Sequence, residues 1–154
     1  IALNIFLFIT LKKRYYLFFS ILIFLYLGSS LSVMEGYILY LFPKTDLMNW
    51  YKIVPVLDMP ALLLYCMSVL DIKRFYFRLY NFMKIVCWFL GFYILILFFL
   101  PLYPTVFINY SLAVFTFCIA IYSGLKVGKK GNKLGYFFVF AYVIWMLLLC
   151  MELV

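Results

Sequence analysis

The stretch IVCWFLGFYILILFFLPLYPTVFINYSLAVFTFCIAIYSGL, residues 85–125, contains no charged side chain. A helix needs about 20 apolar residues to cross a bilayer, so this stretch is too long for a single crossing. Pro101 and Pro104 interrupt it near its middle, where proline disfavours a continuous helix. The stretch therefore predicts two antiparallel membrane-spanning helices, 80–100 and 105–125, joined by the short turn LPLYPT.

The composition of the whole chain agrees with a membrane protein. Of its 154 residues, 70% are apolar, 24% are aromatic and only 12% are charged. A soluble domain has about 25% charged residues, so too few polar side chains are present here to cover a soluble core. Inside a bilayer the backbone N–H and C=O groups must hydrogen-bond within the protein, as they do in a helix. We therefore expect an all-α polytopic transmembrane helical bundle.

Further spans lie on both sides of this stretch. The predicted spans are 1–11 (the end of a truncated helix), 15–33, 51–70, 80–100, 105–125 and 134–154. The span 51–70 is the weakest, because Asp58 and two prolines interrupt it. The sequence thus predicts one transmembrane domain over residues 1–154, with five spans and part of a preceding one. Since the chain begins with isoleucine and ends in an apolar segment, we expect a fragment of a longer protein.

The basic residues are concentrated in alternate connections between these spans. The first, third and fifth connections contain 11 of the 13 Lys and Arg residues. Short connections rich in Lys and Arg stay in the cytoplasm. We therefore expect a multi-pass protein of the cytoplasmic membrane, with residues 12–14, 71–84 and 126–133 facing the anionic lipids of the inner leaflet. The topology-setting residues are Lys12, Lys13, Arg14, Lys73, Arg74, Arg78, Lys84, Lys126, Lys129, Lys130 and Lys133.

The connection 71–84, DIKRFYFRLYNFMK, separates polar from apolar residues at the helical period. At about 100° per residue, its charged side chains and Asn81 fall on one side, and most of its aromatic and aliphatic side chains fall on the other. This pattern predicts an amphipathic helix on the inner membrane surface. Such a helix serves either as an anchor on anionic lipid or as a docking surface for a cytoplasmic partner.

Asp58 is the only acidic residue well inside a predicted span. A charge near the bilayer centre costs about 3 kcal/mol, so such a residue is a candidate for function. It lies about 10 Å from the outer end of its span at 1.5 Å per residue. Other polar residues at a comparable depth complete a candidate ligand or coupling site: Ser29, Ser30, Ser32, Asn109 and Ser111. The alternative is a set of structural hydrogen bonds between helices. Pro60 predicts a kink in the span of Asp58.

The stretch SGLKVGKKGNKLG, residues 123–135, has the lysines and glycines of a phosphate-binding loop. A P-loop needs four residues between its two glycines, followed by Gly-Lys and a hydroxyl residue, after a strand. Here Gly124 and Gly128 are separated by three residues, and Lys129 is followed by Lys130. Nucleic-acid binding would need interleaved aromatic residues. We therefore interpret the stretch as a cytoplasmic connection and expect no nucleic-acid partner.

The sequence offers little for catalysis. It contains no histidine, and its four cysteines lack the paired spacing of metal or redox sites. We therefore expect no enzyme activity, catalytic residue, cofactor or metal in this segment. A small multi-pass transporter or channel and a membrane scaffold subunit are functions that such a composition leaves open. A transporter would need polar residues through both leaflets, and the inner halves of these spans have almost none.

Several stretches resemble the membrane domain of bacterial seven-transmembrane receptors with diverse intracellular signalling modules. They are IALNIFLFITLKKRYYLFF, Gly36 with YLFP at 40–43, VLDIKRFYFRLY, FFLPLYP and GLKVGKKGNKLGYFFVFAYVIW. The resemblance implies a signal-transduction domain that links an extracytoplasmic sensor module to a cytoplasmic output, such as a two-component histidine kinase or a cyclase. Both modules would belong to the same chain outside this segment. A homodimer is one possible assembly. The resemblance assigns no catalytic residue to this segment.

Overall fold

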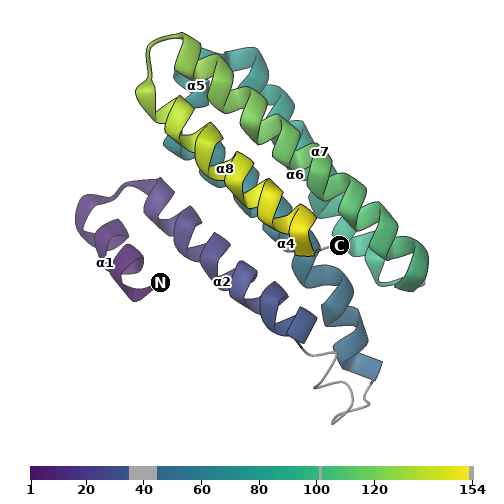
Figure 1. Cartoon of the computed structure of the whole chain (residues 1–154). Helices are drawn as coiled ribbons and strands as arrows, with labels where there is room; N and C mark the ends of the chain where they lie inside the picture. The colour runs from purple at the N-terminus through teal and green to yellow at the C-terminus, as the bar shows by residue number, and fades with distance from the viewer. Residues whose placement is uncertain (35–44, 101, 153–154) are drawn as a thin grey trace.

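The computed structural model describes the backbone of residues 1–34, 45–100 and 102–152, and the side chains of most of them. All regular secondary structure in these ranges is helical, and no strand occurs in them, which confirms the all-α prediction (Figure 1). The helices are α1 (Ala2–Leu11), α2 (Arg14–Met34), α4 (Thr45–Val69), α5 (Ile72–Phe75), α6 (Phe77–Leu97), α7 (Leu102–Lys129) and α8 (Lys133–Glu152).

Helix α4 lies at the centre of the bundle. It packs against α2, α6 and α7, while α8 packs against α7 and α1 lies along α2. Its side chains Val56, Leu63 and Cys66 are completely buried. α4 continues through Pro55 and Pro60, so neither proline ends the helix. The kink at Pro60 stays a prediction.

Helix α6 shows how an apolar helix divides its surface between protein and surroundings. Met83, Val86, Leu90, Tyr93 and Leu97 are buried and recur every three or four residues, which places them on one face. The opposite face carries large apolar side chains, including Trp88, which is 74% exposed. In water such a face would be costly, and in a bilayer it contacts lipid.

Two helical segments in the described part of the chain are long and apolar enough to cross a membrane, Phe77–Leu97 and Phe107–Lys129. The shorter apolar helical segments are Ala2–Leu11, Arg14–Leu27, Pro55–Val69 and Lys133–Ile144. The described residues therefore supply two crossings by this criterion, and the five-span arrangement stays a prediction.

The segment 71–84 differs from the single amphipathic helix expected of it. Asp71 adopts a left-handed conformation with φ 47°, and Tyr76 is extended with φ −146°, so the chain turns at both positions. Only Ile72–Phe75 forms a separate short helix, and residues 77–84 are the first two turns of α6. The predicted separation of polar and apolar residues is largely retained, although Phe82, expected on the apolar side, is 45% exposed.

The turn between α7 and α8 has residues suited to ending one helix and starting the next. Gly131 has φ +93°, a conformation that favours glycine, and it follows directly after the last turn of α7. The Oδ1 atom of Asn132 accepts a hydrogen bond from the Leu134 N–H at 3.1 Å, which caps the start of α8. Because the turn at Gly131 comes only after Lys129, α7 continues through Lys126 and Lys129, beyond the predicted end at residue 125.

Candidate functional site

A hydrogen bond between two buried side chains joins α6 to α7. The Tyr93 hydroxyl donates to Asn109 Oδ1 at 3.0 Å, and both side chains are buried. The sequence identified Asn109 as a candidate but missed its partner. The signal for Tyr93 was its position on the apolar face of α6, three residues after Leu90 and four before Leu97. A tyrosine in such a stripe needs a partner for its hydroxyl group.

The other candidates for a polar intramembrane site lie in different surroundings. Asp58 is half-buried in α4, and its Oδ1 atom is buried. Ser111 is exposed and donates its hydroxyl to the Phe107 carbonyl at 3.0 Å within α7, so it does not join Asn109. The side chains of Ser29, Ser30 and Ser32 lie outside the described residues. The described contacts thus establish the Tyr93–Asn109 pair, and a site that also includes Asp58 stays a prediction.

Three glycines bring α7 and α8 into backbone contact. A Cβ atom added to Gly135 of α8 would lie 2.5 Å from the Gly124 carbonyl oxygen and 2.6 Å from the Gly128 nitrogen, both in α7. No side chain fits at such distances, so the crossing requires glycine. The lysines and glycines of this stretch pointed first to a phosphate loop, so the crossing was not predicted. The signal was the Gly-x-x-x-Gly spacing of Gly124 and Gly128, which is typical of close helix pairs in membranes.

Tyr76 links two of the basic connections. Its hydroxyl donates to the Lys126 carbonyl at 3.3 Å, and the Lys130 ammonium lies 4.6 Å from the centre of its ring. The Lys126 ammonium in turn lies 5.5 Å from the centre of the Tyr122 ring. Cations are attracted to the faces of aromatic rings at these distances. The start of α6 and the end of α7 are therefore joined by a cluster of aromatic and basic residues.

The predicted topology-setting residues lie at the surface, as solvated or headgroup-facing charges require. Lys126 is half-buried and the others are exposed: Lys12, Lys13, Arg14, Lys73, Arg74, Arg78, Lys84, Lys129, Lys130 and Lys133. Their exposure fits contact with anionic headgroups.

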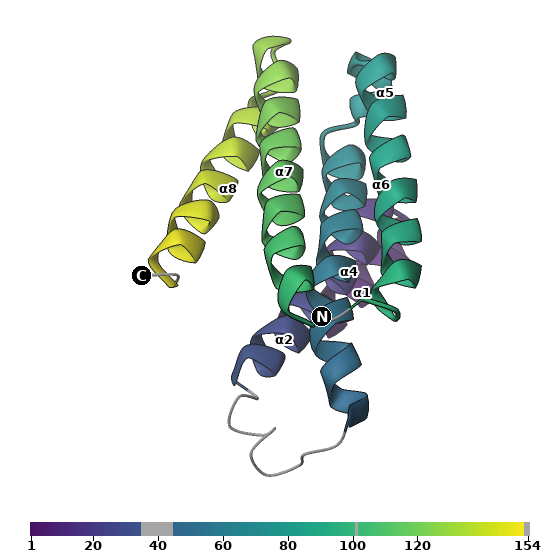
Figure 2. The ribbon, with the colours of Figure 1, turned by 90° about the vertical axis from the view of Figure 1, so that its right-hand side faces the viewer.

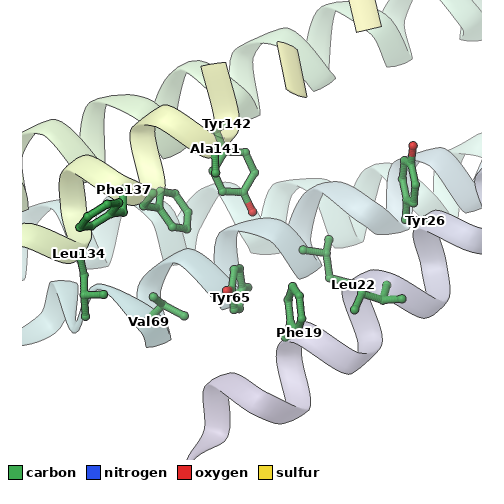
Figure 3. A pocket seen from close by; sticks show the side chains of 11 residues that line it. Phe19, Leu22, Tyr26, Tyr65, Val69, Leu134, Phe137, Ala141 and Tyr142 are labelled. Carbon is green, nitrogen blue, oxygen red and sulfur yellow. The ribbon is translucent and has the colours of Figure 1, made fainter. Parts of the chain in front are cut away.

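An apolar groove of about 480 Å³ lies between α2, α4 and α8 (Figure 3). A row of aromatic rings crosses four helices beside it. The ring centres of Phe19 and Tyr65 are 5.3 Å apart, and those of Tyr65 and Phe138 are 6.2 Å apart. Tyr142 continues the row, 4.4 Å from Phe138 and 6.0 Å from Phe117. None of the residues lining the groove is charged, so it suits an apolar occupant rather than an ion.

The described residues include no group of three or more His, Cys, Asp or Glu side chains placed to hold a metal ion. The cysteines among them, Cys66, Cys87 and Cys118, are free thiols. The expectation that this segment has no cofactor and no catalytic role stays an expectation.

The comparison with protein families covers the entire chain. The model of the family described as "7TM diverse intracellular signalling" matches residues 1–154. The chain belongs to this family. Neither a curated protein nor a solved structure matches it. The resemblance found in the sequence is thereby confirmed, and membership of a 7TM signalling family implies that the domain lies in a membrane.

Proposed function

We propose that the chain is the membrane domain of a bacterial signal-transduction receptor. In this proposal it relays an extracytoplasmic signal to a cytoplasmic output module, such as a histidine kinase or a diguanylate cyclase. The observation that carries the proposal is the match to the 7TM diverse intracellular signalling family over residues 1–154.

The proposed topology has five spans, α2, α4, α6, α7 and α8, with α1 as the end of a preceding one. The basic connections face the cytoplasm. The arrangement of the bundle supports this orientation, since α5 and the α7–α8 turn lie at one end (Figure 1). The C-terminal end of α2 and the N-terminal end of α4 lie at the opposite end. Lys and Arg residues are therefore concentrated where a cytoplasmic surface would be.

Helix α7 is the element best placed to carry a signal. It is continuous from Leu102 to Lys129, and it includes Asn109 near its outer end and Lys126 near its inner end. These two residues are about 25 Å apart at 1.5 Å per residue. Near its outer end, α7 is joined to α6 by the Tyr93–Asn109 hydrogen bond. Near its inner end, it contacts Tyr76 before α6 and Gly135 in α8. A shift of α7 at its outer end would therefore reach the connections 71–84 and 126–133.

The test uses the full-length receptor in its native membrane. Asn109→Leu removes the buried hydrogen-bond acceptor of Tyr93, whereas Ser111→Ala, two residues along the same helix, changes only an exposed hydroxyl. We expect Asn109→Leu to change the activity of the output module while Ser111→Ala leaves it unchanged, at equal protein levels in the membrane. The measurement is kinase autophosphorylation or the cyclic dinucleotide level, according to the output encoded downstream.

Two results would contradict the proposal. One is a parent reading frame that stops soon after Val154 with no output domain. The other is solute uptake into liposomes by the purified protein, with an output that ignores Asn109→Leu. The second result would favour a small transporter.

A further inference from the structure

A second hollow, of about 520 Å³, lies where the start of α6 meets the end of α7. Arg78 and Lys126 line it together with Leu79 and four aromatic residues, Phe75, Tyr76, Phe77 and Tyr122. It therefore combines two positively charged side chains with aromatic rings. None of the residues that line it is acidic.

Two lysine side chains at this hollow, Lys126 in its lining and Lys130 beside it, lie against aromatic rings. The Lys126 ammonium lies 5.5 Å from the Tyr122 ring centre, and the Lys130 ammonium lies 4.6 Å from the Tyr76 ring centre. The Tyr76 hydroxyl bond to the Lys126 carbonyl fixes the two helices at this point. Asp71 is the single acidic residue in the three basic connections, against 11 Lys and Arg residues. The site therefore has a large excess of positive charge and would attract an anion.

The apolar part of the hollow distinguishes its ligand from a simple anion. Phe77 is 61% exposed and Tyr122 is 51% exposed, so both rings offer apolar surface beside the cations. Aromatic rings at membrane interfaces take up positions at the level of lipid headgroups. A free phosphate would use the cations and leave these rings uncovered, whereas a lipid would use both.

We propose that this hollow binds an anionic phospholipid. Its phosphate lies between Arg78 and Lys126, and its glycerol and upper acyl chain lie against Phe77 and Tyr122. The choice of the inner leaflet rests on the proposed orientation, but the site itself does not depend on a signalling role. A lipid bound in this way bridges α6 and α7, so the contact between two cytoplasmic connections becomes sensitive to the lipid composition of the membrane.

The test counts lipids that stay bound to the purified protein in native mass spectrometry, with phosphatidylglycerol as the probe and phosphatidylcholine as the zwitterionic comparison. The variant Arg78→Gln with Lys126→Gln removes the two lining charges. The control variant Lys12→Gln with Lys13→Gln removes equal charge from another exposed basic connection. We expect the first variant to bind phosphatidylglycerol roughly 30-fold more weakly, since each basic residue contributes about a factor of five. The control variant should lose much less affinity, because Lys12 and Lys13 do not line the hollow.

Three outcomes would overturn the proposal. The first is unchanged phosphatidylglycerol binding in the Arg78→Gln, Lys126→Gln variant. The second is an equal loss in the control variant, which would show general attraction to charge. The third is complete competition by inorganic phosphate, which would show a site for the free anion. Phe77→Ser, which keeps all charges and the contact of Lys126 with Tyr122 but removes exposed apolar surface, should also weaken lipid binding, and an unchanged affinity in this variant would overturn the acyl-chain contact.

Discussion

Helix α8 meets α7 and α2 in opposite ways. At its start, Gly135 lies against the backbone of Gly124 and Gly128 in α7, too close for a side chain at position 135. Towards α2 it is lined by large rings, and a groove of about 480 Å³ separates the helices. Figure 2 shows α7 and α8 meeting near their connecting turn and diverging towards the C-terminal end of α8.

This difference shows that side-chain size sets the distance between helices in a membrane, where the hydrophobic effect contributes little to helix association. Lipid tails are as apolar as the side chains, so helices associate through close packing rather than by escaping the solvent. Gly124, Gly128 and Gly135 allow that packing between α7 and α8, whereas a groove lined by large side chains such as Phe19 and Tyr142 lies between α8 and α2. Substitutions at the close contact should therefore cost more stability than substitutions beside the groove or at the polar contacts of α7.

The largest effect is expected from Gly135→Leu. A Cβ atom there overlaps the backbone of α7, so the helices must separate, and we expect the free energy of unfolding to fall by about 3 kcal/mol. Gly91→Leu is the matched control, because a Cβ atom at that helical glycine meets nothing within 4 Å. Thermal unfolding in detergent should show a much lower Tm for Gly135→Leu only. Equal Tm values would show that the crossing is not close.

A smaller effect is expected from Phe138→Leu beside the groove. The substitution removes ring contacts with Tyr65 and Tyr142, and we expect a loss of about 1.5 kcal/mol in unfolding free energy. Phe137→Leu provides the control, because Phe137 also lines the groove but is 71% exposed. The same thermal unfolding assay compares the two, and an equal response would mean that the aromatic row adds no stability.

Tyr93→Phe tests the buried polar contact between α6 and α7. It removes the hydroxyl donor to Asn109 and keeps the ring, so we expect a loss of about 1 kcal/mol. Tyr110→Phe is the control, since Tyr110 is 52% exposed. A double-mutant cycle with Asn109→Leu isolates the pair. A coupling energy of zero would show that the Tyr93–Asn109 hydrogen bond does not stabilise the protein.

The smallest effect is expected from Tyr76→Phe, at about 0.5 kcal/mol. This change removes one partly buried hydrogen bond to the Lys126 carbonyl but leaves the ring beneath Lys130. Tyr76→Leu removes the ring as well and should lower the Tm further. If the two variants unfold at the same temperature, the cation–ring contact contributes nothing.

The sequence predicted the helical class and the approximate helix positions, because charge-free runs and basic connections are visible without a structure. The start of α6 was less accurate, since the turns at Asp71 and Tyr76 leave no clear signal in an apolar and basic segment. Which apolar residues are buried and which are exposed could mostly not be predicted. In α6, Leu90 is 1% exposed and its neighbour Phe89 is 58% exposed, yet both are apolar. When core and lipid-facing positions carry the same residue types, hydrophobic periodicity cannot separate them.

The candidate site was predicted only in part for a related reason. Polar residues inside apolar runs are conspicuous, so Asn109 could be identified directly, while the place of Asp58 in the site stays a prediction. Tyr93 was missed, because its position in the apolar stripe of α6 was a weak signal and its partner lies in another helix. The glycine crossing was open to prediction from the spacing of Gly124 and Gly128, but the surrounding lysines suggested phosphate chemistry first.

The central claim is a membrane domain whose basic connections form its cytoplasmic surface. Alkaline phosphatase fusions test it most directly, because the enzyme is active only outside the cytoplasm. The account predicts active fusions joined near Asn49 and Tyr103 and inactive fusions joined near Arg78 and Lys130. The reverse pattern, or activity at all four positions, would contradict it.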